Sequence, residues 1–173
     1  MSTTRKTTTL RLTVTALLMA VNILLSSFGV PVPGGHLYLN DIVICFAAIL
    51  LGPFEAFLVG GVGAFLGDML FYPPPMFVSL VTHGLQAVVI SLISQRTLKD
   101  HPKLASGIAV TAGALIMITG YSLGRAFIYS TPEYAILKMP FQILQAAVGA
   151  VLGMMLYWRT GLAKLYRKGL AKA

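Results

Sequence analysis

Apolar residues fill this chain so densely that charge is its scarce component. Of the 173 residues, 57% are hydrophobic and only 10% are charged, and the mean hydropathy is +0.82. A soluble domain usually carries about 25% charged residues, because they cover its surface. The composition therefore excludes both a soluble globule and a disordered tail, and it is typical of an integral membrane protein.

The length of the chain limits the number of membrane spans. A helix crosses the bilayer with about 20 apolar residues, so this chain holds roughly six spans joined by short loops and no soluble catalytic domain. Glycine and proline clusters mark the breaks, notably at residues 29–35 and 73–75. We expect an all-α, single six-helix membrane domain over residues 1–173, with a basic tail from residue 159. The expected spans cover residues 10–28, 40–51, 53–72, 76–94, 104–129 and 134–158.

Two of these segments need comment. The second span is too short for a full crossing, so it should start below one surface or sit inside the bundle. The first span follows basic residues, as a signal peptide does, but residues 12–28 exceed a typical signal-peptide core and no A-x-A site follows. We therefore expect a retained first helix.

The positions of the basic residues predict the orientation. Six spans place the N-terminus, the loop after the fourth span and the C-terminal tail on one side of the membrane. These segments hold eleven of the 13 basic residues: Arg5, Lys6, Arg11, Arg96, Lys99, Lys103, Arg159, Lys164, Arg167, Lys168 and Lys172. The positive-inside rule then puts both termini in the cytoplasm of a plasma-membrane protein. The net charge of +8 is thus explained by the orientation of the chain in the membrane, and it does not imply a nucleic-acid partner.

Polar side chains form stripes on the outer halves of the last three spans. Each stripe has residues at i, i+4 and i+7 or i+8, which share one helix face. Ionisable groups at this depth are costly against lipid, so they should face each other or a ligand. Asp68, Asn40 and Asp41 add polar groups near the same ends of spans three and two. The stripes are Ser79, His83 and Gln86; Tyr121, Arg125 and Tyr129; and Lys138, Gln142 and Gln145.

These stripes have two interpretations. In the first they are a structural network, with Arg125 paired to Asp68 or Asp41 to lock the bundle. In the second they line a binding cavity. Convergence of three stripes favours the cavity, and aromatic neighbours beside His83 and Gln86 suit a small, flat, polar ring compound.

Several chemistries have no support in the sequence. The single cysteine, Cys45, excludes an internal disulfide, and three scattered histidines make a poor metal site. No G-x-x-x-x-G-K-[ST] motif occurs, so the chain does not itself bind ATP through a P-loop. Because no nucleophile–base signature occurs either, we expect no enzyme activity, no cofactor and no metal.

Small residues four apart let helix backbones approach closely in lipid. We interpret the glycine pairs 63/67, 120/124 and 149/153 as packing inside the bundle. Ala16 and Ala20 differ, because they lie on the first helix near the cytoplasmic side and suit contact with a partner.

The order of several short motifs resembles a known family. The chain reads GHLYLND at 35–41, LGP at 51–53, GGVG at 60–63 and GD at 67–68. These motifs are similar to those of substrate-binding S components of energy-coupling factor (ECF) vitamin transporters, most closely the hydroxymethylpyrimidine/pyridoxine-type branch. PFQILQ at 140–145 is like that branch's P-x-N-x-x-Q, and ALLMA at 16–20 matches the A-x-x-x-A with which S components dock.

The resemblance implies a subunit that captures a vitamin or its precursor at the outer face and topples to carry it inward. Its implied partners are a transmembrane coupling subunit and two cytoplasmic ATPase subunits, besides the lipid bilayer. Ala16 and Ala20 would dock on the coupling subunit. The stripes and motifs together nominate the substrate-binding residues His36, Asn40, Asp41, Asp68, His83, Gln86, Tyr121, Arg125, Tyr129, Lys138, Gln142 and Gln145.

Two departures from the family pattern leave the vitamin open. Arg125 stands where many relatives carry a carboxylate, and Gln142 replaces an asparagine. A positive group there favours a ligand with an acceptor or anionic edge. The alternative function is a ligand-free structural or regulatory membrane subunit. A channel is disfavoured, because the inner halves of spans three to six are almost purely apolar.

Overall fold

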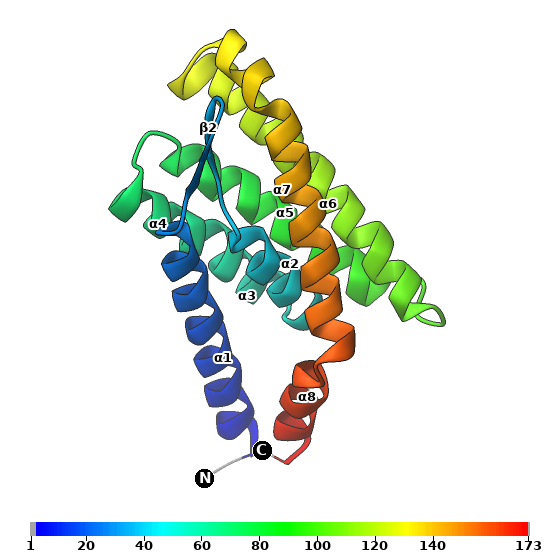
Figure 1. Ribbon diagram of the computed structural model, residues 1–173. Helices are drawn as coiled ribbons and strands as arrows, with labels where there is room; N and C mark the ends of the chain where they lie inside the picture. Colours follow the sequence, from blue (N-terminus) through cyan, green and yellow to red (C-terminus); the bar gives the residue numbers. More distant parts are fainter. Residues whose placement is uncertain (1–2, 173) are drawn as a thin grey trace.

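The chain folds into a helical bundle with one small β-hairpin (Figure 1). The computed structural model describes the backbone of residues 3–172 and the side chains of residues 7–171, so Met1, Ser2 and Ala173 of the expected domain lie outside the described residues. The elements are α1 (Thr3–Ser26), β1 (Val30–Val32), β2 (Gly35–Leu37), α2 (Asn40–Leu50), α3 (Pro53–Phe57), η1 (Leu58–Val62), α4 (Gly63–Phe71), α5 (Met76–Arg96), α6 (Pro102–Gly124), η2 (Arg125–Tyr129), α7 (Pro132–Arg159) and α8 (Leu162–Lys172).

The helices fit the expected membrane bundle. Five helical segments are long and apolar enough to cross a membrane, at residues 7–26, 53–71, 76–96, 102–129 and 132–159. The short second helix, α2, has nine buried residues out of 11, so it sits inside the bundle as its length predicted. Six spans are therefore an approximate description: five long helices surround one short buried helix.

Two long helices contain a π-helical turn, which the sequence did not reveal. The η1 turn joins α3 to α4, and η2 extends α6. Such wide turns release a backbone carbonyl from the regular pattern and are frequent at functional sites. At η1 the buried Asn22 of α1 donates its Nδ2–H to the carbonyl of Val59, at 2.6 Å.

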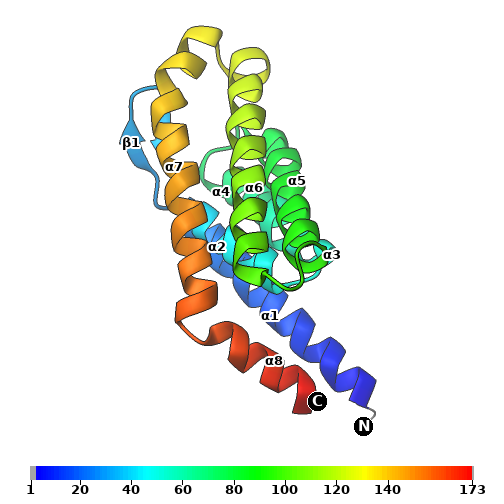
Figure 2. The ribbon, with the colours of Figure 1, turned by 90° about the vertical axis from the view of Figure 1, so that its right-hand side faces the viewer.

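The basic tail contains a helix that the sequence analysis did not predict. Residues 162–172 form α8, a helix that lies beside the start of α1 (Figures 1 and 2). Close packing explains the contact, because a Cβ at Gly169 would come within 2.9 Å of Leu10 Cδ2. The helix α1 also begins earlier than expected, at Thr3 instead of residue 10.

The glycine pairs pack helices together, as their spacing predicted. A Cβ at any of the six positions would clash with the neighbouring helix, so only glycine permits the observed approach. The contacts join Gly63 and Gly67 to Asn22 and Ser26 of α1, Gly120 and Gly124 to Thr82 and Val78 of α5, and Gly149 and Gly153 to Asp41 and Cys45 of α2.

The connections divide the molecule into two halves. Both termini lie at one end, called here the terminal half, and the α5–α6 connection points toward the same end (Figure 1). The hairpin, the α4–α5 connection and the α6–α7 turn lie in the other half, called here the hairpin half. This grouping agrees with the expected loop sides. Apolar side chains such as Ile44, Phe46 and Ile90 form the core between the helices.

Candidate functional site

The β-hairpin lies over the polar side chains that the helices carry in the hairpin half. Strands β1 and β2 pair antiparallel with Val30 opposite Leu37 and Val32 opposite Gly35. Pro33 and Gly34 form the two-residue turn, and Gly34 has φ +79°, a conformation that favours glycine. The turn lies beside α7, where a Cβ at Gly34 would come within 2.9 Å of Lys138.

Side chains from η2 and α7 hold the hairpin in place. Arg125 Nη1 donates to the carbonyl of Gly34 at 2.6 Å, and Lys138 Nζ donates to the carbonyl of His36 at 2.5 Å. The backbone N–H of Tyr38 donates to Gln145 Oε1 at 3.0 Å. The predicted structural pairing of Arg125 with Asp68 or Asp41 is absent from the described residues, because Arg125 binds a backbone carbonyl instead. Two cations therefore clamp the hairpin onto the bundle.

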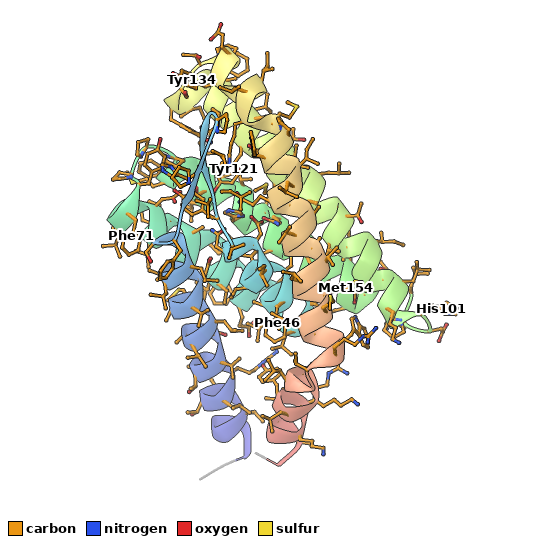
Figure 3. All side chains as sticks on the ribbon, in the orientation of Figure 1. Phe46, Phe71, His101, Tyr121, Tyr134 and Met154 are labelled. Atoms are coloured by element: carbon orange, nitrogen blue, oxygen red, sulfur yellow. The ribbon has the colours of Figure 1, made fainter. Side chains whose placement is uncertain are left out.

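Behind the hairpin lies a small cavity of about 40 Å³. Figure 3 shows Tyr121 in this region, among the polar side chains behind the two strands. Ten of the twelve residues nominated for substrate binding line the cavity: His36, Asn40, Asp68, His83, Tyr121, Arg125, Tyr129, Lys138, Gln142 and Gln145. The structure therefore brings the three stripes together.

The other two nominated residues, Asp41 and Gln86, lie behind the cavity wall. Asp41 is 1% exposed and accepts hydrogen bonds from Gln86 Nε2 at 3.1 Å and from Gln145 Nε2 at 2.7 Å. His83 Nδ1 lies 2.7 Å from Gln86 Oε1, which only accepts, so Nδ1 carries the proton. Asp41 thus positions cavity side chains through Gln86 and Gln145.

A second network orients Asp68 at the cavity wall. Ser79 Oγ donates to Asp68 Oδ2 and lies 2.5 Å from the hydroxyl oxygen of Tyr121. Because Ser79 gives its only proton to the carboxylate, the Tyr121 hydroxyl donates to Ser79. The rings of His83 and Tyr121 lie 5.1 Å apart between centroids, so an aromatic wall adjoins the carboxylate.

Gln142 has a structural contact as well. Its Nε2 donates to the carbonyl of Ile118 on α6, at 2.7 Å. The side chain therefore ties α7 to α6 while the residue also lines the cavity.

Four buried polar atoms around the cavity have no partner among the described residues. They are His36 Nδ1, Asn40 Oδ1, Arg125 Nε and Tyr129 Oη. An unpaired buried polar group costs about 1–3 kcal/mol, so several in one place indicate that something else satisfies them. Tyr129 also lies under the Arg125 guanidinium, with 5.2 Å between Cζ and the ring centroid. The cavity thus offers an aromatic surface with unused donors and acceptors.

The sequence analysis missed two tyrosines of the cavity wall, Tyr38 and Tyr72. Tyr38 follows His36 by two residues, and Tyr72 follows Asp68 by four, so both spacings pointed to the same faces. Burial raises the pKa of Tyr38 to about 12, with a smaller contribution from the Asp68 carboxylate. Its hydroxyl is therefore neutral at physiological pH. Gly35, Pro75 and Met117 complete the wall.

The nominated docking residues lie elsewhere. Ala16 and Ala20 are both exposed on α1, beside the exposed side chains of Leu17 and Leu24. The opposite side of the same helix packs on the bundle, where Asn22 is fully buried. The structure thus leaves the small-residue face of α1 uncovered. Residues 7–171 hold no group of three or more His, Cys, Asp or Glu side chains suited to a metal.

The chain is similar in sequence to several known proteins. The family model described as "ECF-type riboflavin transporter, S component" matches residues 6–164. The thiamine precursor transporter HmpT of Lactococcus lactis subsp. cremoris is 32% identical over 166 residues, covering 91% of this chain and 93% of that protein. An uncharacterized protein of Pyrococcus woesei is 31% identical over 126 residues, covering 72% of this chain and 82% of its own length.

Proposed function

This chain belongs to the S-component family of ECF-type transporters, and from that premise we propose that it captures hydroxymethylpyrimidine, or a pyridoxine-like ring, in the cavity behind the hairpin. The family consists of multi-pass membrane subunits for uptake of vitamins or their precursors, and these subunits are not enzymes. The substrate, the site and the coupling scheme below are our proposal.

One observation carries it: four buried polar atoms that have no partner among the described side chains surround one small aromatic cavity. A substituted aminopyrimidine matches this set. Its exocyclic amino group donates to Asn40 Oδ1, while Arg125 Nε and the Tyr129 hydroxyl donate to ring nitrogens or the hydroxymethyl oxygen. The flat ring lies against aromatic side chains such as Tyr121, which is the ordinary makeup of a selective small-molecule pocket.

The size of the cavity supports a single-ring ligand. About 40 Å³ is room for little more than a water molecule or two, so a vitamin needs a wider cavity, and in our proposal the hairpin moves outward to provide it. A one-ring compound requires a small displacement, whereas the three-ring riboflavin requires a large one. The family description names riboflavin, but the relative that aligns along nearly the whole chain is named for a thiamine precursor. We therefore favour the smaller ligand.

The contacts that hold the hairpin closed also control the access of a ligand to the cavity. Arg125 and Lys138 bind the carbonyls of Gly34 and His36, and a ligand with an acceptor or anionic edge competes for the same cations. Pyridoxine has a phenolic oxygen of this kind, and hydroxymethylpyrimidine has ring nitrogens. Arg125, which departs from the family pattern, therefore serves both hairpin closure and ligand recognition.

Transport requires partners, because the chain has no P-loop of its own. In our proposal a transmembrane coupling subunit docks on Ala16 and Ala20, and two cytoplasmic ATPases supply the energy. Both termini are then cytoplasmic. Single-cysteine labelling in a Cys45→Ala background tests this orientation: Pro74→Cys should react with an external reagent in intact cells, and Lys99→Cys should not. External labelling at position 99 contradicts it.

The substrate is tested with the purified chain in detergent. Native mass spectrometry identifies any small molecule that co-purifies, and thermal unfolding is then measured with hydroxymethylpyrimidine, pyridoxine and riboflavin in turn. Ligands that bind only the folded state raise the melting temperature with concentration. We expect a rise with one of the two single-ring compounds and none with riboflavin. A rise with riboflavin alone contradicts the proposed substrate, and no rise with any compound favours the ligand-free structural subunit.

A further inference from the structure

A second cavity lies in the terminal half, far from the first. It measures about 500 Å³ and is bounded by α8, the start of α1 and the α5–α6 connection. None of its lining residues belongs to the cavity behind the hairpin. Neither the proposed capture of a vitamin nor the docking face at Ala16 and Ala20 uses it.

The charged groups of this cavity are cations. Arg11, Lys99 and Arg167 line it, each from a different element. Arg11 Nε lies 3.7 Å from Glu55 Oε1, so its charge is partly offset. In the part of the chain that the structure describes, Lys99 and Arg167 have no carboxylate within 4 Å. Asp100 lines the neighbouring surface beside Trp158 and not the cavity.

An aromatic side chain contacts one of these cations, Arg167, and a second aromatic residue adds a donor. Arg167 Nη2 donates to the hydroxyl of Tyr157, and its Cζ lies 5.8 Å from the centroid of that ring. Trp158 packs edge-on against Tyr157, with 5.0 Å between centroids, and its buried indole N–H has no partner among the described residues. Two polar lining residues already donate within the bundle, Gln95 to Leu51 O and Ser106 to Pro102 O. The groups that an anion could use are therefore the Lys99 and Arg167 charges and the Trp158 N–H.

The surroundings match a lipid better than a soluble anion. Leu50, Leu98 and Leu170 give the cavity an apolar side. On α8 the exposed Leu162 and Leu165 alternate with Lys164 and Lys168, a pattern typical of a helix lying in the membrane interface. Basic residues at such a surface attract anionic headgroups.

We propose that this cavity binds a phosphate-bearing anion, with the headgroup of an anionic phospholipid as its source. Lys99 and Arg167 bind the phosphate oxygens, the Trp158 N–H donates to the headgroup, and the acyl chains follow the leucines toward the bilayer. Bound lipid then fixes α8 against α1. Free inorganic phosphate has the same chemistry without the acyl chains, so the test separates the two sources.

The test uses the full chain in neutral detergent. Native mass spectrometry measures retention of dioleoyl phosphatidylglycerol against dioleoyl phosphatidylcholine, and thermal unfolding measures the effect of inorganic phosphate. The Lys99→Gln/Arg167→Gln variant removes two charges inside the cavity. Arg96→Gln/Arg159→Gln removes two charges from exposed positions outside it and serves as the matched control. Trp158→Phe removes only the indole donor, and it tests the site even where the double variant does not fold.

We expect the parent and the control to retain phosphatidylglycerol roughly tenfold better than phosphatidylcholine, and the cavity variant to lose this preference. Trp158→Phe should reduce it about threefold, as loss of one hydrogen bond does. A melting shift with phosphate, absent in the cavity variant and without a lipid preference, supports the anion site and contradicts the lipid source. Equal loss in the control, or no preference and no phosphate effect in the parent, overturns the proposal.

Discussion

The two cavities of this bundle differ in size and in how their polar groups are held. The cavity behind the hairpin measures about 40 Å³ and is enclosed by side chains fixed in networks, such as Asp41 with Gln86 and Gln145. The terminal-half cavity measures about 500 Å³ and has cations on exposed, long side chains. Preorganised donors and acceptors select one small molecule, whereas loosely held cations select only charge. In our proposal, selectivity for the ligand therefore belongs to the hairpin half.

Away from the cavity behind the hairpin, several buried polar side chains are paired within the bundle, although Asn22 Oδ1 has no partner among the described residues. Ser91 Oγ donates to the carbonyl of Leu51 at 2.7 Å, and Gln95 Nε2 donates to the same oxygen at 2.5 Å. Inside a membrane such internal pairing is required, because lipid supplies no hydrogen bonds. Four of the six unpaired buried atoms among the described side chains gather next to the hairpin, and in our proposal a ligand pairs with them. The variants described below each change residues of one region, and the first two also test whether the function of the other region is unaffected.

The largest effect is expected on the uncovered face of α1. Replacing Ala16 and Ala20 by Trp prevents close approach of a partner helix, so uptake should fall at least tenfold and co-purification of the coupling subunit should be lost. Ligand affinity of the isolated chain should stay within about twofold. Leu115→Trp, on the exposed side of α6, is the control and should transport normally. Normal transport by the Ala16/Ala20 variant would contradict the docking role. Loss of ligand binding by the isolated variant would show instead that this face of α1 belongs to the bundle core.

The opposite pattern is expected at Arg125. Arg125→Ala removes a hairpin contact and a cavity donor, so ligand affinity should fall about ten- to hundredfold, as for one or two buried hydrogen bonds. The variant should still co-purify with the coupling subunit. Titration calorimetry gives the affinity, and Ile136→Ala, at an exposed position of α7, should match the parent. Unchanged affinity would mean that Arg125 only supports the fold.

A similar but smaller effect is expected at His83, which is 1% exposed and bonded to Gln86. His83→Ala should weaken ligand binding about tenfold, while the protein still inserts and folds. If both His83→Ala and Arg125→Ala bind like the parent in titration calorimetry, these residues are structural.

Helix packing provides a prediction on stability. A Cβ at Gly149 would clash with Asp41, so Gly149→Val should push α2 from α7 and destabilise the fold by about 1–3 kcal/mol. Ligand affinity should fall as well, because Asp41 then loses Gln145. Gly107→Val is the control, since a side chain there meets nothing within 4 Å. Thermal unfolding in detergent compares the two, and equal melting temperatures would contradict the packing account.

The smallest effect is expected at Tyr38. Tyr38→Phe removes one hydroxyl from the cavity wall and should weaken ligand binding about two- to fivefold. Because the pKa of Tyr38 is raised to about 12, the hydroxyl stays protonated between about pH 6 and 9 and the difference between parent and variant should not change with pH. A difference that disappears as the pH rises toward 9 would show that the hydroxyl ionises there and that the wall is wetter than described.

Helical periodicity predicted most of the hairpin-half cavity. The stripes of His83, Tyr121 and Gln145 follow from spacing alone, because a helix fixes which residues share a face. Periodicity does not tell which member faces the cavity and which supports it. Asp41 and Gln145 are 104 residues apart, so their hydrogen bond depends on tertiary packing. The hairpin clamp by Arg125 and Lys138 was missed for the same reason.

The missed helix α8 has a different cause. Its four basic residues led us to describe the segment only as a basic tail, yet Leu162, Leu165 and Tyr166 recur at helical spacing. The π-helical turns have no sequence signal of this kind, because one extra residue in a turn depends on contacts such as that of Asn22 with Val59.

Ligand protection of single cysteines tests the central claim that the hairpin-half cavity is the binding site. Tyr72→Cys and Lys99→Cys, each in a Cys45→Ala background, place one thiol at each cavity. The rate of alkylation is measured in the purified protein with and without saturating hydroxymethylpyrimidine. We predict at least tenfold slower alkylation at position 72 and an unchanged rate at position 99. Equal rates at position 72 with and without bound ligand, or protection at position 99 instead, would contradict the account.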